Sequence, residues 1–411
     1  MSSNADSPAT PEGPWAVGRI FLRLGLSSFG GPVAHLGYFR HEFVVRRGWL
    51  DEAAYAELVA LCQFLPGPAS SQVGMALGLR RAGYAGALAA WCGFTLPSAL
   101  ALVLLAQGLA RAGMAPPWAQ GALHGLKVVA VAVVAQAVWG MARQLCPDAW
   151  RRLLAAAVAA LALAWPTPWT QVGSMALAAA LGATGALPLP PAQAAPLHET
   201  LEVRSLREGA AWLALFFALL LSLPLLAALA QGDVQAVLRL VGAFYRAGAL
   251  VFGGGHVVLP LLQAEVVPLG WVSEDTFLAG YGAAQAVPGP LFTFAAFLGA
   301  ARTAAPNGWL GGAIALVAIF APAFLLLAGA LPFWGRLRDS APARRALTAV
   351  NTAVVGVLLA ALIDPVARYG LRGAADAFLA AVALLALMRW RAPPWLVVLG
   401  CAATGAGLAA L

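Results

Sequence analysis

Two short stretches built from glutamine, proline and glycine are the residues of this chain best suited to bind a solute. Gln63, Pro66, Gly67 and Pro68 form the first, inside an apolar segment long enough to cross a bilayer. Prolines on either side of a glycine remove an amide donor and side-chain support, so we expect the helix to break there. Inside a membrane, the freed backbone groups must be satisfied by protein, water or a bound solute. The break is therefore a candidate binding site.

The same pattern occurs a second time, in Gln285, Pro288, Gly289 and Pro290, at an interval of 222 positions (288 minus 66). Other landmarks keep nearly this interval. They are the pairs Gly48-Trp49 and Gly270-Trp271, Phe29-Gly30-Gly31-Pro32 and Phe252-Gly253-Gly254-Gly255, Gly83 and Gly308, and Pro97 and Pro322. Several landmarks in one order at one spacing indicate a tandem duplication.

The composition excludes a soluble globule. Of 411 residues, 61% are hydrophobic and 10% charged, and the mean hydropathy is +0.81, whereas charged residues make up about 25% of ordinary domains. Apolar runs of about 20 residues favour helices over an outer-membrane barrel. We predict an all-α integral membrane protein of two homologous halves with inverted topology, whose helices are broken by Gly and Pro or re-entrant.

Basic residues give the chain a net charge of +8, and they cluster between the apolar segments. That placement is typical of membrane topology and argues against a nucleic-acid partner. Four cysteines without paired spacing indicate neither a disulfide framework nor a metal site. Catalytic and nucleotide-binding patterns are missing, so we expect no enzyme activity and no cofactor.

The expected segments follow the duplication. Broken apolar segments are predicted at 15–33, 53–79, 235–255 and 276–301. Plain spans are predicted at 84–108, 118–142, 152–165, 169–187, 209–230, 308–332, 346–363, 374–388 and 394–410. Polar amphipathic stretches are expected after residue 33 and from Gln263 to Asp275.

The distribution of basic residues between loops distinguishes two topologies. If each broken segment enters and leaves by the same face, most basic loop residues share one face; if the broken segments cross, the asymmetry weakens. The positive-inside rule favours re-entrant hairpins, with crossing segments as the alternative. Either way an odd number of spans separates the copies, so the second copy is inverted, as in many secondary transporters. The N-terminus would be cytoplasmic and the C-terminus periplasmic.

The chain then divides into four parts. These are a disordered cytoplasmic tail (1–14), an N-terminal transporter repeat (15–187), a cytoplasmic linker (188–208) and a C-terminal repeat (209–411) with an extra helix at 209–230.

The residues around the breaks suit an anion. A helix that starts at a break directs its N-terminus, the positive end of its dipole, into the interior. Arg23, Arg246 and Lys127 are basic residues within apolar segments, and among acids only Glu57 is expected at comparable depth. The alternatives are snorkelling for the two arginines and charge pairing or a structural role for Lys127.

Several neighbours of the breaks have two interpretations. Gly30, Gly31 and the run Gly253–Gly255 would let the backbone approach a solute closely. His256 could bond an oxyanion, carry a proton or simply pack, and Gln63 and Gln285 could cap freed backbone or contact solute. His35 is expected in a loop, and Asn351 in a hydrogen bond between helices.

At Phe29–Pro32 with His35, Gly48–Leu50, Gln63–Pro68, Phe252–Gly255 with Pro260, and Pro288–Pro290, the sequence resembles the chromate ion transporter family in its long-chain, two-domain form. The resemblance covers about residues 15–365. It implies export of chromate across the bacterial inner membrane, chromate resistance, and coupling to the proton motive force. By motif it assigns substrate contact to Gly30, Gly31, Pro32, Pro66, Gly67, Pro68, Gly253, Gly254, Gly255, Pro288, Gly289 and Pro290.

Two alternatives remain beside chromate export. Chromate mimics sulfate in charge and shape, so the first alternative is transport of sulfate or another oxyanion. The second is a membrane scaffold or sensor whose breaks only pack helices. The oligomeric state is also open, with a homodimer among the choices.

Overall fold

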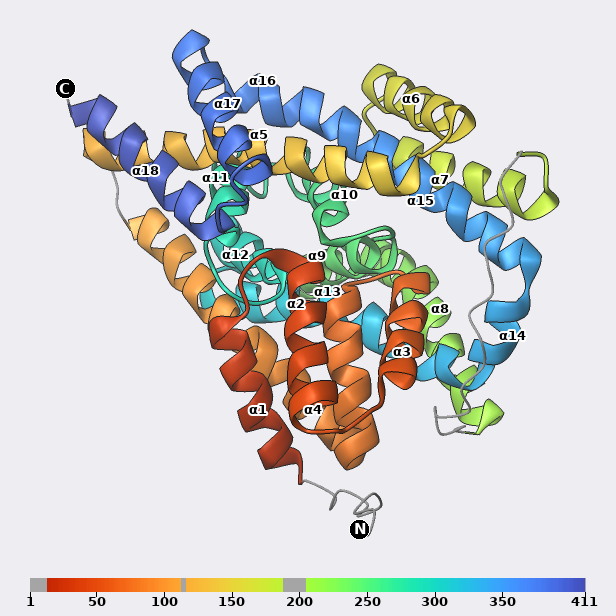
Figure 1. Ribbon diagram of the computed structural model, residues 1–411. Helices are drawn as coiled ribbons and strands as arrows, with labels where there is room; N and C mark the ends of the chain where they lie inside the picture. Colours follow the sequence, from red (N-terminus) through yellow and green to blue (C-terminus); the bar gives the residue numbers. More distant parts are fainter. Residues whose placement is uncertain (1–12, 112–115, 188–204, 411) are drawn as a thin grey trace, which may run out of the picture.

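The computed structural model describes residues 13–111, 116–187 and 205–410, and every regular element in these ranges is a helix (Figure 1). The predicted tail at 1–14 lies outside the described residues except for 13 and 14. The predicted linker at 188–208 lies outside them except for its last four residues, which already lead into a helix that begins at Leu206.

The first half contains two helix pairs followed by three further helices. In order these are α1 (Pro14–Ser27), α2 (Gly31–Arg40), the π-helical turn η1 (His41–Arg46), α3 (Glu52–Phe64), α4 (Ala69–Arg111), α5 (Pro117–Leu145), α6 (Ala149–Ala164) and α7 (Pro168–Thr184). Helix α4 is two helices joined at a kink, because Ala82 and Gly83 have non-helical dihedral angles.

The second half repeats this order after the extra helix α8 (Leu206–Leu229). Its elements are α9 (Gly232–Ala249), η2 (Gly255–Val257), α10 (Val258–Val266), α11 (Glu274–Ala284), η3 (Leu291–Thr293), α12 (Phe294–Ala301), α13 (Gly308–Ala330), η4 (Leu331–Phe333), α14 (Trp334–Asp339), α15 (Ala341–Ala361), η5 (Leu362–Ala367), α16 (Arg368–Gly370), α17 (Ala374–Met388) and α18 (Pro394–Ala410). The duplication read from the sequence is thus a duplication of helices.

All four predicted breaks separate helices. They fall between α1 and α2, α3 and α4, α9 and η2, and α11 and η3. One expectation was wrong: the stretch after residue 33 continues as α2 and η1. Gly30 therefore separates two helices instead of ending one, because Gly31 and Pro32 start a new helix, where proline needs no amide partner.

Five helices are long and apolar enough to cross a membrane. They are Ala69–Ala110, Pro117–Leu145, Leu206–Leu229, Gly308–Asp339 and Ala341–Gly370. Four of the nine predicted plain spans, α6, α7, α17 and α18, have 16, 17, 15 and 17 residues, short of the roughly 20 that span the hydrocarbon core. They form the pairs α6–α7 and α17–α18.

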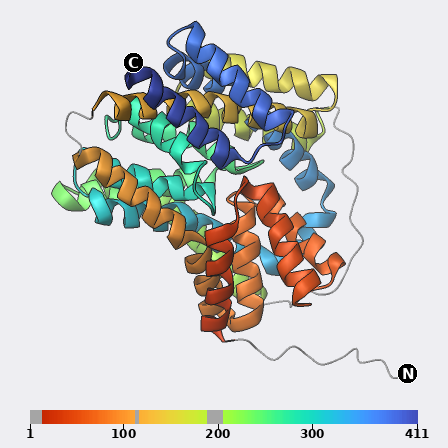
Figure 2. The ribbon, with the colours of Figure 1, turned by 60° about the vertical axis from the view of Figure 1, so that its left-hand side comes forward.

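The two halves exchange these short pairs. Helices α17 and α18 of the second half pack on α5 of the first, and α6 and α7 of the first pack on α15 of the second. Between α5 and α18 the backbones touch, since a Cβ on Gly121 would lie 2.2 Å from the Gly405 carbonyl oxygen. Figure 2 shows this layer of yellow and blue helices above the red and orange helices of the chain's start.

A buried ion pair also joins the halves. Arg338 on α14 donates from Nη1 to Glu57 Oε1 on α3 at 3.0 Å, and the Trp334 indole donates to the same oxygen at 3.2 Å. The two charged side chains are 7% and 9% exposed. Glu57 is therefore held within protein, and its charge is compensated from the opposite half.

Candidate solute-binding site

The four helix breaks meet inside the molecule and bond to each other across the repeat. The amide of Gly67 donates to the carbonyl of Val251 at 2.7 Å, and the amide of Gly289 donates to the carbonyl of Ser28 at 2.9 Å. Donors and acceptors are repeat partners, 222 (289 minus 67) and 223 (251 minus 28) positions apart. Each proline-flanked glycine is thus fixed to the glycine-rich loop of the other half.

Pro32 and Gly255 occupy equivalent positions in the two repeats and lie against each other. A Cβ on Gly255 would be 3.1 Å from Pro32 Cγ. A second proline ring at residue 255 would overlap the first, so close contact of equivalent positions explains why one is proline and the other glycine. The difference between the two motifs follows from their contact.

Gly67 and Gly289 also fit closely against the long helices. Both have left-handed backbone angles, with φ of 122° and 104°, where a side chain would be strained. A Cβ on Gly67 would lie 3.0 Å from Ala323 Cβ, and one on Gly289 would lie 2.9 Å from Ser98 Oγ. Ala323 and Ser98 each follow a matched helix proline, so this packing is repeated in both halves.

Four helices begin at the meeting point of the breaks. α2 starts at Gly31, α4 at Ala69, η2 at Gly255 and η3 at Leu291. The first amides of a helix have no partner within it, and its dipole makes this end positive. The helix starts around the meeting point therefore give it a positive potential, which favours a negatively charged solute.

Buried polar atoms without hydrogen-bond partners gather around the same point. Among the described residues they include Ser28 Oγ, Ser71 Oγ, Gln72 Oε1, Thr95 Oγ1, Gln285 Nε2 and Asn351 Oδ1. Buried polar groups are normally hydrogen-bonded, so a concentration of unsatisfied ones marks a place that a polar guest can occupy.

One side chain satisfies a backbone carbonyl that a break leaves free. Gln72 Nε2 donates to the carbonyl of Pro66 at 3.0 Å, the group freed by the interruption. The sequence motif ended at Pro68, and Gln72 was missed; its place on the first turn of the next helix was the available signal.

Some predicted residues lie in the site and others at its edge. Gln285 is half-buried with an unpartnered amide nitrogen, whereas Gln63 is exposed. His256 Nδ1 lies 2.8 Å from the Tyr281 hydroxyl. Asn351 does not make the expected helix-to-helix bond; its Oδ1 is buried and unpartnered, 3.5 Å from where a Cβ of Gly253 would be.

His35 was expected in a loop, but it is a buried residue of α2. Its Nε2 donates to the Ser28 carbonyl at 3.2 Å, and its Nδ1 accepts from the Ser70 hydroxyl at 3.4 Å. Ser28 O also accepts from Gly289, so His35 supports the bond between the halves. Its apolar neighbours in the sequence gave no signal of this role.

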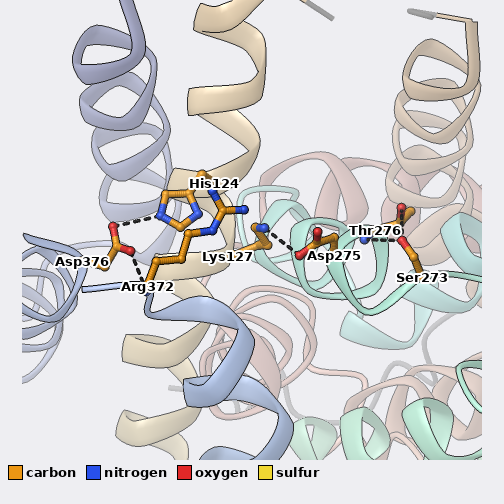
Figure 3. Close-up of polar contacts among 7 residues, drawn as sticks. All are labelled: His124, Lys127, Ser273, Asp275, Thr276, Arg372 and Asp376. Carbon is orange, nitrogen blue, oxygen red and sulfur yellow. Dashed lines mark hydrogen bonds and ion pairs between the residues drawn. The ribbon is translucent and has the colours of Figure 1, made fainter. Parts of the chain in front are cut away.

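The predicted bases differ in how their charges are balanced. Arg246 makes a two-pronged ion pair with Glu265, at 2.9 and 2.7 Å. The buried Lys127 donates to Asp275 at 2.7 Å, and Figure 3 shows this pair beside the bond between His124 and Asp376. Glu265 is thus a second mostly buried acid, beside Glu57, that balances a base, whereas Asp275 is 64% exposed and meets the buried Lys127 from the surface.

Arg23, the repeat partner of Arg246, is exposed and has no ion pair among the described residues. Its potential partner Glu42 is equivalent to Glu265 but pairs with Arg46 and Arg47, at 3.0 and 2.6 Å. The uncompensated charge near the breaks thus belongs to the first half.

These features define a class: an all-helical, multi-span membrane protein of two repeats whose broken helices meet at one polar point. A family model described as chromate transporter matches residues 15–186 and 238–406. The chain belongs to this family, which is one of transporters and not of enzymes.

Known relatives agree with this assignment. A chromate transport protein of Pseudomonas aeruginosa is 30% identical over 347 residues, covering 84% of this chain and 79% of the relative. A chromate transport protein of Cupriavidus metallidurans is 27% identical over 394 residues, or 90% and 87% of the two chains. No solved structure matches significantly.

A shorter relative matches part of the chain. An uncharacterized transporter of Bacillus subtilis is 30% identical over 162 residues, which cover 38% of this chain and 88% of the relative. This relative is thus about half as long as the present chain.

Proposed function

We propose that this protein is a secondary transporter that exports chromate across the bacterial inner membrane and thereby confers chromate resistance. The observation that carries the proposal is the pair of cross-repeat hydrogen bonds, Gly67 to Val251 and Gly289 to Ser28, which brings four helix N-termini to one point. The names of the chromate-transporting relatives supply the solute class.

The solute would be held mainly by the backbone. Glycines at 30, 31, 253, 254 and 255 would admit close approach to the backbone, while Gly67 and Gly289, whose amides bond to Val251 and Ser28, would hold the loops in place. Gln285 would donate from its unpartnered amide, and Arg23 would add a positive charge near the entrance. Such a site selects a tetrahedral dianion by charge and shape, so sulfate is the competing substrate.

In this proposal the halves are inverted and the broken segments are re-entrant, with a cytoplasmic N-terminus and a periplasmic C-terminus. The side-by-side packing of α1 to α4, which Figure 1 shows, is what two helical hairpins in the first half would require. Rocking of two such halves would open the shared site to either side in turn. A proton gradient would drive the exchange.

Flux measurements test the proposal. Liposomes that contain the purified full-length protein are loaded with unlabelled chromate, and the entry of labelled chromate is followed. Parallel vesicles are assayed in the same way with sulfate. We expect chromate exchange that excess sulfate inhibits and that empty liposomes lack. Sulfate exchange that chromate only inhibits would favour the sulfate carrier, and absence of both fluxes would favour a scaffold or sensor.

A further inference from the structure

A second polar region lies away from the helix breaks, at the opposite end of the α10–α11 pair. A cavity of about 300 Å³ is bordered by α10, α11, α15 and α16, with α6 and α7 beside it. Its polar lining consists of Gln171, Gln263, Glu274, Asp364, Arg368 and Tyr369. Glu274 begins α11, whereas the break lies beyond the other end of that helix, so this cavity is separate from the proposed anion site.

Glu274 is the one acid of this lining without a basic partner among the described residues. Its Oε1 accepts from Gln263 Nε2 at 2.7 Å, while its Oε2 is buried without a hydrogen-bond partner. The Gln171 Oε1 that lines the same cavity is likewise buried and unpartnered. Two unpartnered acceptors in one cavity call for a donor, and protonation of Glu274 would create one.

The charged neighbours leave Glu274 uncompensated. Arg368 is paired with Asp364 at 2.9 Å, and Lys127 with Asp275 at 2.7 Å. The remaining titratable group of the lining is the Tyr369 phenol. Both nearby bases are therefore already paired. Their acids, Asp364 and Asp275, are themselves close enough to Glu274 to repel its negative charge. A partly buried carboxylate in such surroundings readily takes up a proton.

The two repeats differ in the side chain that binds this acid. Glu52 and Glu274 are repeat partners at an interval of 222 (274 minus 52), and Arg40 and Gln263 at 223 (263 minus 40). In the first half Arg40 binds Glu52 with two hydrogen bonds, at 2.8 and 2.5 Å. In the second half the acid is retained, but its arginine is replaced by a neutral glutamine. The acid at this position is thus bound to an arginine in one half and only to a neutral amide in the other.

We infer that Glu274 is the proton-binding carboxylate that couples transport to the proton gradient. One proton adds to Oε2 when the cavity is open to the acidic side and leaves the same oxygen when it is open to the other side, with no further bond formed or broken. The inference rests on the proposed transport function, because it assigns the counter-ion of the same exchange.

The test separates anion exchange from proton coupling. Liposomes containing the full-length protein and a pH-sensitive dye are assayed twice, once for chromate–chromate exchange at equal pH and once for chromate movement driven by a pH gradient. For Glu274→Gln we expect the exchange to persist, and both gradient-driven movement and the accompanying proton flux to be lost. Glu52→Gln is the matched control and should keep all three.

A second variant covers the case in which Glu274→Gln fails to insert. Gln263→Arg restores the arginine of the first repeat, should pair with Glu274, and should abolish gradient-driven movement while exchange continues. Unchanged proton-driven transport in either inserted variant would overturn the inference, as would transport driven by sodium but not by protons. Absence of exchange in the wild-type protein would instead remove the proposed function itself.

Discussion

At the scale of single residues, the central glycines are fixed by space as well as by backbone angle. Gly289 has a φ of 104°, and a Cβ there would lie 2.9 Å from Ser98 Oγ. We predict that Gly289→Ala lowers chromate flux severalfold while the protein still inserts, because left-handed strain costs about 1–2 kcal/mol and the amide bonded to Ser28 is displaced. Flux in liposomes and protein content of the membrane are the measurements.

The control for that variant is Gly400→Ala on α18, where a Cβ would meet nothing within 4 Å. It should transport at the wild-type rate. Equal flux from both variants would show that the close fit at Gly289 has no bearing on transport.

The repeat-related arginines should respond differently to the same substitution. Arg23→Gln should reduce flux without changing stability, since Arg23 has no acid to leave unpaired among the described residues. Arg246→Gln leaves the mostly buried Glu265 without its base and should destabilise the protein by about 1–3 kcal/mol. Thermal unfolding in detergent measures the second effect, and Arg246→Gln with Glu265→Gln should recover most of it.

If Arg23→Gln transports normally, Arg23 does not belong to the solute pathway. If Arg246→Gln melts at the wild-type temperature, the pair with Glu265 contributes little to stability.

At the scale of helices, the sequence predicted the breaks well because proline and glycine act locally. Pro66–Pro68 and Pro288–Pro290 interrupt helices where the pattern placed them. After residue 33 the sequence indicated a polar amphipathic stretch with His35 in a loop, whereas the chain there is helical and α2 buries His35 and Phe39. Ion pairs such as Arg246 with Glu265 depend on how helices are paired, and spacing along one chain does not encode that.

The buried pair between α3 and α14 should matter more than an exposed pair of the same chemistry. Glu57→Gln removes the cross-repeat acid of Arg338, which is 7% exposed and keeps only the exposed Asp339 at 3.3 Å, and we expect a loss of about 1–3 kcal/mol. Glu52→Gln breaks a pair whose side chains are 55% and 57% exposed and should change stability little, because solvent screens such a pair. Denaturant unfolding of the two variants checks the difference; similar losses would contradict it.

At the scale of the whole molecule, duplication could be recognised from the sequence but the exchange of helices could not. Interval and order of Gly48, Gly83, Pro97 and their partners established two copies. Helices α6 and α7 pack on α15 of the other half through long-range contacts between small residues. At one such contact, a Cβ on Gly356 would lie 2.3 Å from the Ala155 carbonyl oxygen. Alanine and glycine are too common in this chain for such contacts to be read from sequence.

The inverted arrangement has a direct test in two exposed repeat partners. Arg46 follows the first helix pair of one half and Leu269 the first pair of the other, 223 positions apart (269 minus 46). Their exposed fractions are 61% for the Arg46 side chain and 59% for Leu269. In a variant with Cys62, Cys92, Cys146 and Cys401 replaced, we predict that a membrane-impermeant thiol reagent applied to intact cells labels Leu269→Cys and leaves Arg46→Cys unlabelled.

In opened cells the reagent should label Arg46→Cys as well, which shows that this thiol is not buried in the protein. Equal labelling of both positions in intact cells would place the two loops on one side of the membrane. The halves would then be parallel, and the bonds from Gly67 to Val251 and from Gly289 to Ser28 would join loops that enter from the same face. Rocking about such a contact would not expose a shared site to the two sides alternately, so the labelling pattern decides whether this geometry can support transport by alternating access.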